Sequence, residues 1–225
     1  MNPRLTNKKL VIFDLDGTLL DTIADLAESA NYALKQLGYP THPTEIIRTY
    51  VGNGINKLLF RALPEEDKTE ENVMRMRTHF IPYYDEHNAD LSQPYPGIVA
   101  LLEELQKKGL MIAVASNKYQ EATEELVARH FGAYRFTCVL GQREGHPIKP
   151  DAGIIFEAMA ACEGVRPDEV IYCGDSDVDM QTGINAGVRT VGVTWGFRSR
   201  EELAAYSPCL LADNPEEIHN FIALT

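Results

Sequence analysis

Five short apolar runs along the chain predict buried β-strands. Each run ends at a polar residue or a glycine, and together they cover residues 10–13, 110–115, 136–140, 170–173 and 188–193. Runs this short and this apolar are typical of strands that are buried on both faces, as in a parallel sheet.

Stretches with helical periodicity separate these runs. Apolar residues recur at positions 98, 101, 102 and 105, which predicts a helix over residues 98–108. Similar patterns predict helices over residues 121–130, 154–162 and 180–186. The alternation of strand and helix predicts an α/β fold class, a Rossmann-like open parallel sheet with helices on both faces.

Residues 20–92 interrupt this alternation, because they contain helical patterns and no convincing buried strand. The first helix is expected to have Asp21 as its N-cap and Gly38 as its stop signal. Further helices are predicted over residues 44–50, 54–63 and 68–87. We therefore predict a helical-bundle domain inserted into a core that consists of residues 1–19 and 93–225.

Composition narrows the classes of partner. The 225 residues include 21 Lys and Arg against 33 Asp and Glu, a net charge of −12, which disfavours a nucleic-acid partner. No apolar stretch approaches the roughly 18 residues that a membrane helix needs, and the polar first ten residues predict no signal peptide. Four scattered cysteines without a CxxC motif are expected to be reduced, buried thiols of a cytoplasmic protein. The oligomeric state stays open.

Polar side chains gather where the predicted strands end, and ligands of parallel α/β sheets bind at that edge. The polar residues at these ends are Asp14, Asp16, Ser116, Asn117, Lys149, Asp175 and Asp179. Several carboxylates in one crevice repel each other unless a cation offsets their charge. Carboxylate oxygens together with phosphate and water suit Mg²⁺, and a lysine and a hydroxyl suit an anionic substrate. The sequence therefore predicts a metal-dependent site for phosphoryl chemistry.

These residues resemble the four motifs of phosphatases in the haloacid dehalogenase superfamily. Residues 14–18 match the DxDGT signature, and Ser116, Lys149 and residues 174–179 resemble the second, third and fourth motifs in the same order. The resemblance covers essentially the whole chain, and the helical insertion is similar to the cap domain of one large subgroup. Three segments resemble loops of phosphoglycolate phosphatase-like members of that superfamily: residues 50–54, 116–118 and 194–197.

The resemblance implies a role for each motif. Asp14 would attack phosphorus and form a phospho-aspartate, and Asp16 would protonate the leaving alkoxide and later activate water. Ser116, the Asn117 N–H and Lys149 would hold the phosphate oxygens, where charge accumulates in the transition state.

The resemblance also implies a Mg²⁺ cofactor and a set of residues near the leaving group. The metal would be bound by the carboxylates of Asp14, Asp175 and Asp179, the last directly or through water, and by the backbone carbonyl of Asp16. The cap would close over a small phosphorylated metabolite and bring three residues to its leaving group: Asn53, Arg48 and Lys118.

Phosphoglycolate is the single best expectation for the substrate, although the sequence does not identify it. The same residues would serve a sugar phosphomutase of the β-phosphoglucomutase type or an inorganic pyrophosphatase. A more remote alternative is a phospho-accepting signalling module. Asp16 and the helical insertion argue against that module, because a signalling receiver needs a long-lived phospho-aspartate and no lid.

Overall fold

The computed structural model describes residues 8–223 of the chain. Residues 1–7 and 224–225, which belong to the ranges predicted for the core, lie outside the described residues. The prediction about a signal peptide falls mostly on this first segment and stays a prediction.

Six strands form one sheet, and every neighbouring pair in it is parallel. The order across the sheet is β5, β4, β1, β6, β7, β8, so β1 lies between β4 and β6. The strands are β1 Leu10–Phe13, β4 Met111–Tyr119, β5 Cys138–Gln142, β6 Val170–Gly174, β7 Arg189–Val193 and β8 Leu210–Ala212. All of β1 and β6 is buried, which explains why these segments are apolar without alternation.

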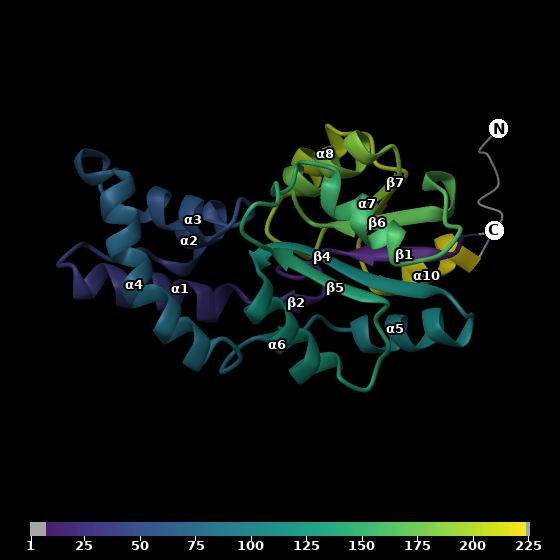
Figure 1. Ribbon diagram of the computed structural model, residues 1–225, viewed down its shortest axis with the longest axis horizontal. Helices are drawn as coiled ribbons and strands as arrows, with labels where there is room; N and C mark the ends of the chain where they lie inside the picture. The colour runs from purple at the N-terminus through teal and green to yellow at the C-terminus, as the bar shows by residue number, and fades with distance from the viewer. Residues whose placement is uncertain (1–7, 224–225) are drawn as a thin grey trace.

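Helices cover both faces of the sheet (Figure 1). Val11 and Phe13 of β1 pack on one face in a core with α5, α6 and α10, and Leu10 and Ile12 pack on the other with α7 and α8. Successive side chains of a strand point to opposite faces, so one short apolar run supplies both cores. The predicted Rossmann-like fold class is confirmed. The helices are α5 Ile98–Lys107, α6 Gln120–Phe131, α7 Gly153–Ala160, α8 Asp177–Ala186, α9 Arg200–Ala204 and α10 Pro215–Ala223.

Residues 20–92, which we call the helical segment, have a hydrophobic core of their own. This core is built from four helices together with Ala122 of α6, and the segment lies beside the sheet (Figure 1). The connections that enter and leave it pair with each other as short antiparallel strands, β2 (Leu20–Asp21) and β3 (Gln93–Pro94). The helices are α1 Ile23–Gln36, α2 Thr44–Tyr50, α3 Ile55–Ala62 and α4 Glu70–His87.

A buried carboxylate ties the returning connection to α1. Asp25, in the first turn of α1, accepts hydrogen bonds from the backbone N–H groups of Leu91 (3.0 Å) and Ser92 (2.8 Å) and from the Ser92 hydroxyl (2.6 Å). Both connections are therefore fastened close to the start of one helix.

The structure corrects several expectations about single elements. Thr22, and not Asp21, is the N-cap residue of α1, because Asp21 belongs to β2. Strand β4 continues to Tyr119, four residues beyond the apolar run that predicted it, so its last part is polar. Helices α9 and α10 and strand β8 were not predicted, and both α9 and β8 are too short for a periodic pattern.

The described residues also bear on the predicted environment of the chain. None of the helices within residues 8–223 is long and apolar enough to span a membrane. The four cysteines are unpaired, as expected; Cys162 and Cys173 are buried and Cys138 is half-buried. Cys209 is exposed, so the expectation of a buried thiol is wrong there.

Candidate active site

The carboxyl ends of three neighbouring strands meet at the edge of the sheet that faces the helical segment. Asp14 directly follows β1, Asp175 directly follows β6, and Ser116 lies in the last part of β4. The strand order places these three residues side by side because β1 lies between β4 and β6. A cavity that is partly open to solvent lies between this edge and the helical segment. The helical segment contributes to its wall with Leu26, Val51, Gly52, Ile55, Leu58 and Tyr84.

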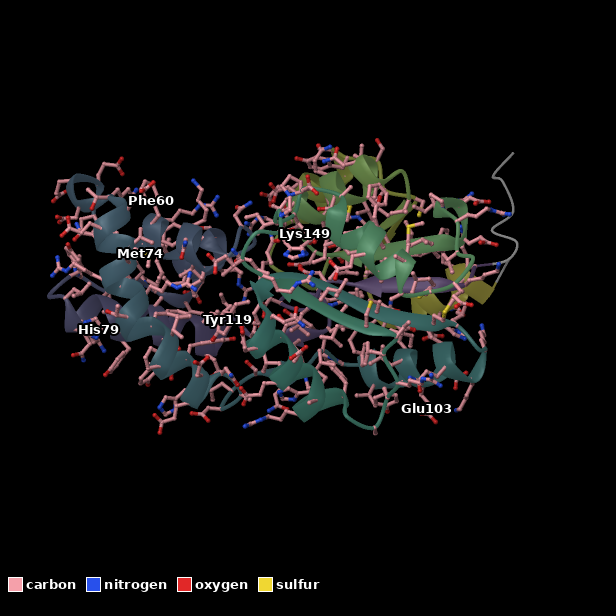
Figure 2. The ribbon with its side chains drawn as sticks, in the orientation of Figure 1. Phe60, Met74, His79, Glu103, Tyr119 and Lys149 are labelled. Carbon is pink, nitrogen blue, oxygen red and sulfur yellow. The ribbon has the colours of Figure 1, made fainter. Side chains whose placement is uncertain are left out.

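A buried lysine lies at the centre of the acidic residues. Lys149 donates hydrogen bonds from its Nζ to the Ala115 carbonyl (3.0 Å), the Tyr172 hydroxyl (2.9 Å) and Asp179 Oδ1 (2.7 Å). The Tyr172 hydroxyl in turn donates to the same Asp179 oxygen at 2.6 Å. Neighbouring carboxylates raise the pKa of Lys149 despite its burial, so the ammonium is charged. Lys149 lies over the sheet in Figure 2.

Asp14 is the second carboxylate beside this ammonium. Its Oδ1 lies 2.9 Å from Lys149 Nζ, but the three Nζ hydrogens already serve the partners named above. Asp14 Oδ1 is therefore buried beside a positive charge and makes no well-aligned hydrogen bond within the described residues. Burial, with the negative charge of Asp179, raises the pKa of Asp14 to about 7, and Lys149 opposes this rise.

Asp175 is fixed between a hydroxyl and a backbone amide. Thr18 Oγ1 donates to its Oδ1 at 3.1 Å, and the Phe197 N–H donates to its Oδ2 at 2.7 Å. Burial, aided by the charges of Asp179 and Asp14, raises the pKa of Asp175 well above its usual range. Two glycines make room for this side chain: a Cβ at Gly17 or at Gly196 would lie 2.3 Å or 2.2 Å from Asp175 atoms.

Carboxylate oxygens of Asp14, Asp175 and Asp179 lie within 4.8 Å of one another, a spacing that one cation can span. Asp179 already accepts two hydrogen bonds at each oxygen, since the Ser176 N–H (3.1 Å) and hydroxyl (2.6 Å) both donate to Oδ2. Asp14 and Asp175 retain free lone pairs, and their raised pKa values mark sites where a cation would stabilise the ionised forms. The donor set is oxygen only, as Mg²⁺ requires.

Asp16 lies apart from this cluster, on the side of the helical segment. Its Oδ1 accepts a hydrogen bond from the Thr22 hydroxyl at 2.7 Å, and its Oδ2 lies 3.1 Å from Lys118 Nζ. Lys118 is buried in the wall of the cavity and also donates to the Tyr84 hydroxyl of α4 at 2.7 Å. Asp16 is thus held between a lysine of the sheet and a hydroxyl at the start of the helical segment.

The residues expected near the leaving group have different positions. Lys118 lines the cavity, whereas neither Asn53 nor Arg48 is part of its wall. The Asn53 Oδ1 accepts a hydrogen bond from Arg61 Nη2 at 2.8 Å, and the Arg48 guanidinium stands 5.8 Å from the ring centre of Phe197. Of the three residues, the structure brings only Lys118 to the site.

Ser116 and Asn117 lie at the bottom of the cavity. Ser116 Oγ accepts a hydrogen bond from the Lys118 N–H at 3.2 Å, which leaves its hydroxyl hydrogen free for a ligand. The Asn117 side chain is engaged with protein groups, so only its backbone N–H, the group that the resemblance implies, is a candidate for binding phosphate.

Sequence reasoning missed four residues that shape the site: Tyr172, Tyr84, Thr22 and Arg198. A signal existed for Tyr172, because its hydroxyl is the single polar side-chain group in an otherwise apolar run of β6. Tyr84 carries no comparable signal, since only the packing of the helical segment on the sheet brings it to the cavity. Arg198 lies in the irregular connection between β7 and α9, which has no periodic pattern.

We predict that Gly17→Ala impairs the site more than Gly145→Ala does. Both glycines have left-handed backbones (φ 83° and 77°), so an alanine costs about 1–2 kcal/mol at either position. Only at Gly17 would the new Cβ also collide with Asp175, whereas nothing lies within 4 Å at Gly145. For Gly17→Ala alone, we expect a further loss of about 1–3 kcal/mol in unfolding free energy. We also expect its kcat/KM to fall roughly 10-fold or more. Denaturant unfolding and steady-state kinetics of both variants measure this, and equal losses would contradict the proposed close packing on Asp175.

Comparison with known proteins shows which family the chain resembles. A family model described as haloacid dehalogenase-like hydrolase matches residues 11–193. A phosphoglycolate phosphatase of Vibrio parahaemolyticus is 34% identical over 222 residues, which cover 96% of this chain and 97% of that protein. A phosphoglycolate phosphatase of Haemophilus influenzae is 33% identical over 93% of this chain and 96% of its own. These matches confirm the resemblance that the four motifs predicted.

A solved structure is similar along nearly the whole chain. It is that of a protein from Lactobacillus delbrueckii subsp. bulgaricus whose proposed activity is also that of a phosphoglycolate phosphatase. The two superpose with a TM-score of 0.90 at 32% sequence identity, over 96% of this chain and 99% of that one. Sheet and helical segment therefore share one arrangement in the two proteins.

Proposed function

Because the chain belongs to the haloacid dehalogenase-like hydrolase family, we propose that it is a Mg²⁺-dependent phosphatase that hydrolyses a small phosphate monoester through a phospho-aspartate. One observation carries this proposal. Asp14, buried beside the Lys149 ammonium and without a well-aligned hydrogen bond at Oδ1, lies at the cavity together with a second carboxylate, Asp16, that is held apart from it.

In the first step a carboxylate oxygen of Asp14 attacks phosphorus and the bond from phosphorus to the ester oxygen breaks. Asp16 gives its proton to that oxygen, so the leaving group departs as a neutral alcohol. Lys149 and the Ser116 hydroxyl stabilise negative charge on the phosphoryl oxygens, and burial strengthens both interactions because little water competes.

In the second step a water molecule attacks the phospho-aspartate. Asp16, now ionised, takes a proton from that water, and the bond from Asp14 to phosphorus breaks to release inorganic phosphate. Lys118, whose Nζ lies 3.1 Å from Asp16 Oδ2, helps to fix the position of this carboxylate. Thr22 keeps the Asp16 carboxylate oriented through its hydrogen bond.

Asp14 and Asp175 would hold the Mg²⁺ ion, with Asp179 close by and the Asp16 carbonyl as a further ligand. The ion would neutralise charge among the carboxylates and on the phosphate. Asp179 contributes in a second way that needs no metal, because it fixes Lys149 through the 2.7 Å hydrogen bond.

For the substrate we propose phosphoglycolate, the molecule named for the curated relatives. Lys118 supports this choice, since its ammonium lies in the cavity wall beside Asp16, where it would also pair with a carboxylate on the leaving group. We further propose that residues 20–92 act as a cap on the core of residues 1–19 and 93–225, and that the enzyme is cytoplasmic. Apolar side chains of this cap would exclude water during the reaction.

Release of phosphate from a panel of esters tests the proposed function. Phosphoglycolate, p-nitrophenyl phosphate, glucose 1-phosphate and pyrophosphate are each incubated with the enzyme and Mg²⁺, with and without a chelator. We expect phosphoglycolate to have the highest kcat/KM and chelation to abolish activity. Conversion of glucose 1-phosphate to an isomeric sugar phosphate would identify a mutase instead, and no phosphate release from any ester would overturn the proposal.

We also predict that Mg²⁺ stabilises the fold increasingly as pH rises from about 5 to about 8. The raised pKa values of Asp14 and Asp175 mean that the folded metal-free protein binds protons more tightly than the unfolded chain. That contribution to stability is complete below about pH 4 and is lost as pH rises through the folded values. Mg²⁺ prefers the ionised carboxylates and should add about 2.7 kcal/mol at one hundred times its Kd. Thermal unfolding with and without Mg²⁺ measures this; an increment that is independent of pH, or that persists in Asp175→Asn, would contradict the assignment.

A further inference from the structure

Two side chains of the core bind backbone carbonyls of the helical segment where α2 ends. The last carbonyls of a helix have no partner within it. Here Arg198 donates from Nη2 to the Val51 carbonyl (2.7 Å) and from Nη1 to the Arg48 carbonyl (3.3 Å). Asn117 Nδ2 donates to the Gly52 carbonyl at 3.0 Å. These two side chains hold residues 48–52, which we call the docking segment, against the core.

The two side chains differ in what else they contact. Asn117 also pairs with both backbone groups of Lys149, accepting from its N–H at 2.8 Å and donating to its carbonyl at 3.0 Å. Arg198 has no contact with Lys149, and its third partner is the half-exposed Asp177 at 3.5 Å. One docking side chain is therefore linked to the phosphate-binding lysine, and the other is not.

We propose that Asn117 is a positioning residue that couples docking of residues 48–52 to the placement of Lys149. The planar amide makes three hydrogen bonds at once, one to the docking segment and two to Lys149. If the docking segment moves away, Asn117 loses an acceptor in a buried position, where an unpaired donor is costly. If the Asn117 amide rotated to find another acceptor, it would lose its hydrogen bonds to the backbone of Lys149.

The consequence would reach the reacting atoms through Lys149. Its Nζ lies 2.9 Å from Asp14 Oδ1, and a displacement of its backbone moves that ammonium relative to the nucleophile. The phosphate site is then complete only when the helical segment is docked. A substrate would be committed to phosphoryl transfer after closure and not before.

The experiment compares Asn117→Ala with Arg198→Ala. Both variants lose hydrogen bonds to the docking segment, but only the first loses its hold on Lys149. Acetyl phosphate serves as the phosphoryl donor, because it is small and its leaving group needs no proton. One measurement is the rate at which Asp14 becomes phosphorylated, followed by intact-protein mass spectrometry. The other is amide hydrogen exchange of residues 48–54, which reports docking.

Faster exchange at residues 48–54 is expected in both variants. Phosphorylation of Asp14 should slow roughly 10- to 100-fold in Asn117→Ala, the effect of a displacement of about 1 Å. In Arg198→Ala it should slow by a smaller factor that follows the gain in exchange, because Asn117 still holds Lys149 whenever residues 48–52 are docked. Faster exchange in Arg198→Ala with phosphorylation at the wild-type rate would contradict the coupling. Slow phosphorylation in Asn117→Ala with unchanged exchange would mean that it supports Lys149 without any coupling to docking.

The inference rests on the proposed function. Phosphorylation of the wild-type enzyme distinguishes a failure of the inference from a failure of the proposed function. If the wild type gains no phosphoryl group, the proposed function fails; if it does and Arg198→Ala is phosphorylated at the wild-type rate despite faster exchange, only the coupling fails. Should Asn117→Ala not fold, Asn117→Asp replaces it. Aspartate keeps the volume and the acceptor for the Lys149 N–H but lacks the donors for both carbonyls, so the same pattern of exchange and phosphorylation is expected.

Discussion

Asp14→Asn should abolish turnover, with a fall in kcat on the order of 10⁴- to 10⁶-fold. An amide is a far poorer nucleophile than a carboxylate, so the phospho-enzyme cannot form. The substitution also removes a negative charge beside Lys149 and Asp175, which weakens the proposed metal site. Within residues 8–223 the neighbouring Asp179 does not replace Asp14, because four hydrogen bonds occupy its carboxylate.

Mass spectrometry of the intact protein after a short incubation with substrate is the direct measurement. No phosphoryl group should be found on Asp14→Asn. The matched control is Asp177→Asn, which alters a carboxylate at the start of α8 that is half-exposed and outside the cavity wall. It should retain activity within about threefold, as is usual for a surface substitution. Phosphorylation of Asp14→Asn at any other residue would place the nucleophile elsewhere.

Asp16→Asn should slow the complete reaction by roughly 10²- to 10⁴-fold, the usual contribution of general acid–base catalysis. Asparagine can neither protonate the leaving alkoxide nor accept a proton from water. The backbone carbonyl of residue 16 is unchanged, so the proposed metal ligands remain. Asp14 should still accept a phosphoryl group from p-nitrophenyl phosphate, whose leaving group needs little protonation.

The expected observation is a phospho-enzyme that persists in Asp16→Asn and is short-lived in the wild type. A burst of p-nitrophenolate equal to the enzyme concentration, followed by slow turnover, gives the same information kinetically. Asp85→Asn is the control, since Asp85 is an exposed carboxylate of α4 that accepts a hydrogen bond from the hydroxyl of Tyr119, which is labelled in Figure 2. If Asp16→Asn turned over without accumulating phospho-enzyme, Asp16 would act in the first step only.

The strands and the motifs could be predicted because their physical signals are local. A strand buried on both faces must be apolar, and β1 and β6 are. The order of strands then brings Asp14 and Asp175 together, whatever the details of packing. The polar end of β4 could not be predicted in the same way. Lys118 is buried there only because Asp16 and Tyr84 compensate its charge and its donors, and those partners come from distant parts of the chain.

The loop that contains Asn53 shows how much a glycine pattern can predict. Glycines on both sides of Asn53 indicate a close approach of backbone, and a Cβ at Gly54 would lie 3.2 Å from Gln142 and 3.4 Å from the Asn117 carbonyl. Gly52 and Gly54 line the cavity, whereas Asn53 does not and accepts a hydrogen bond from Arg61. A glycine pattern therefore predicts that the backbone lies close to another group, but it does not predict which group that is.

The position of β1 has a consequence for how the protein is made on the ribosome. Leu10 pairs with Met111 of β4 and with Val170 of β6, so this strand is synthesised long before either of its partners. The helical segment follows β1 immediately and can bury its own core from local contacts, which form quickly. Until β6 emerges, β1 is an apolar strand with at least one unpaired edge, a template for pairing with other chains. The strand order therefore exposes the nascent β1 to pairing with other chains until most of the protein has been made, a hazard that the finished molecule no longer reveals.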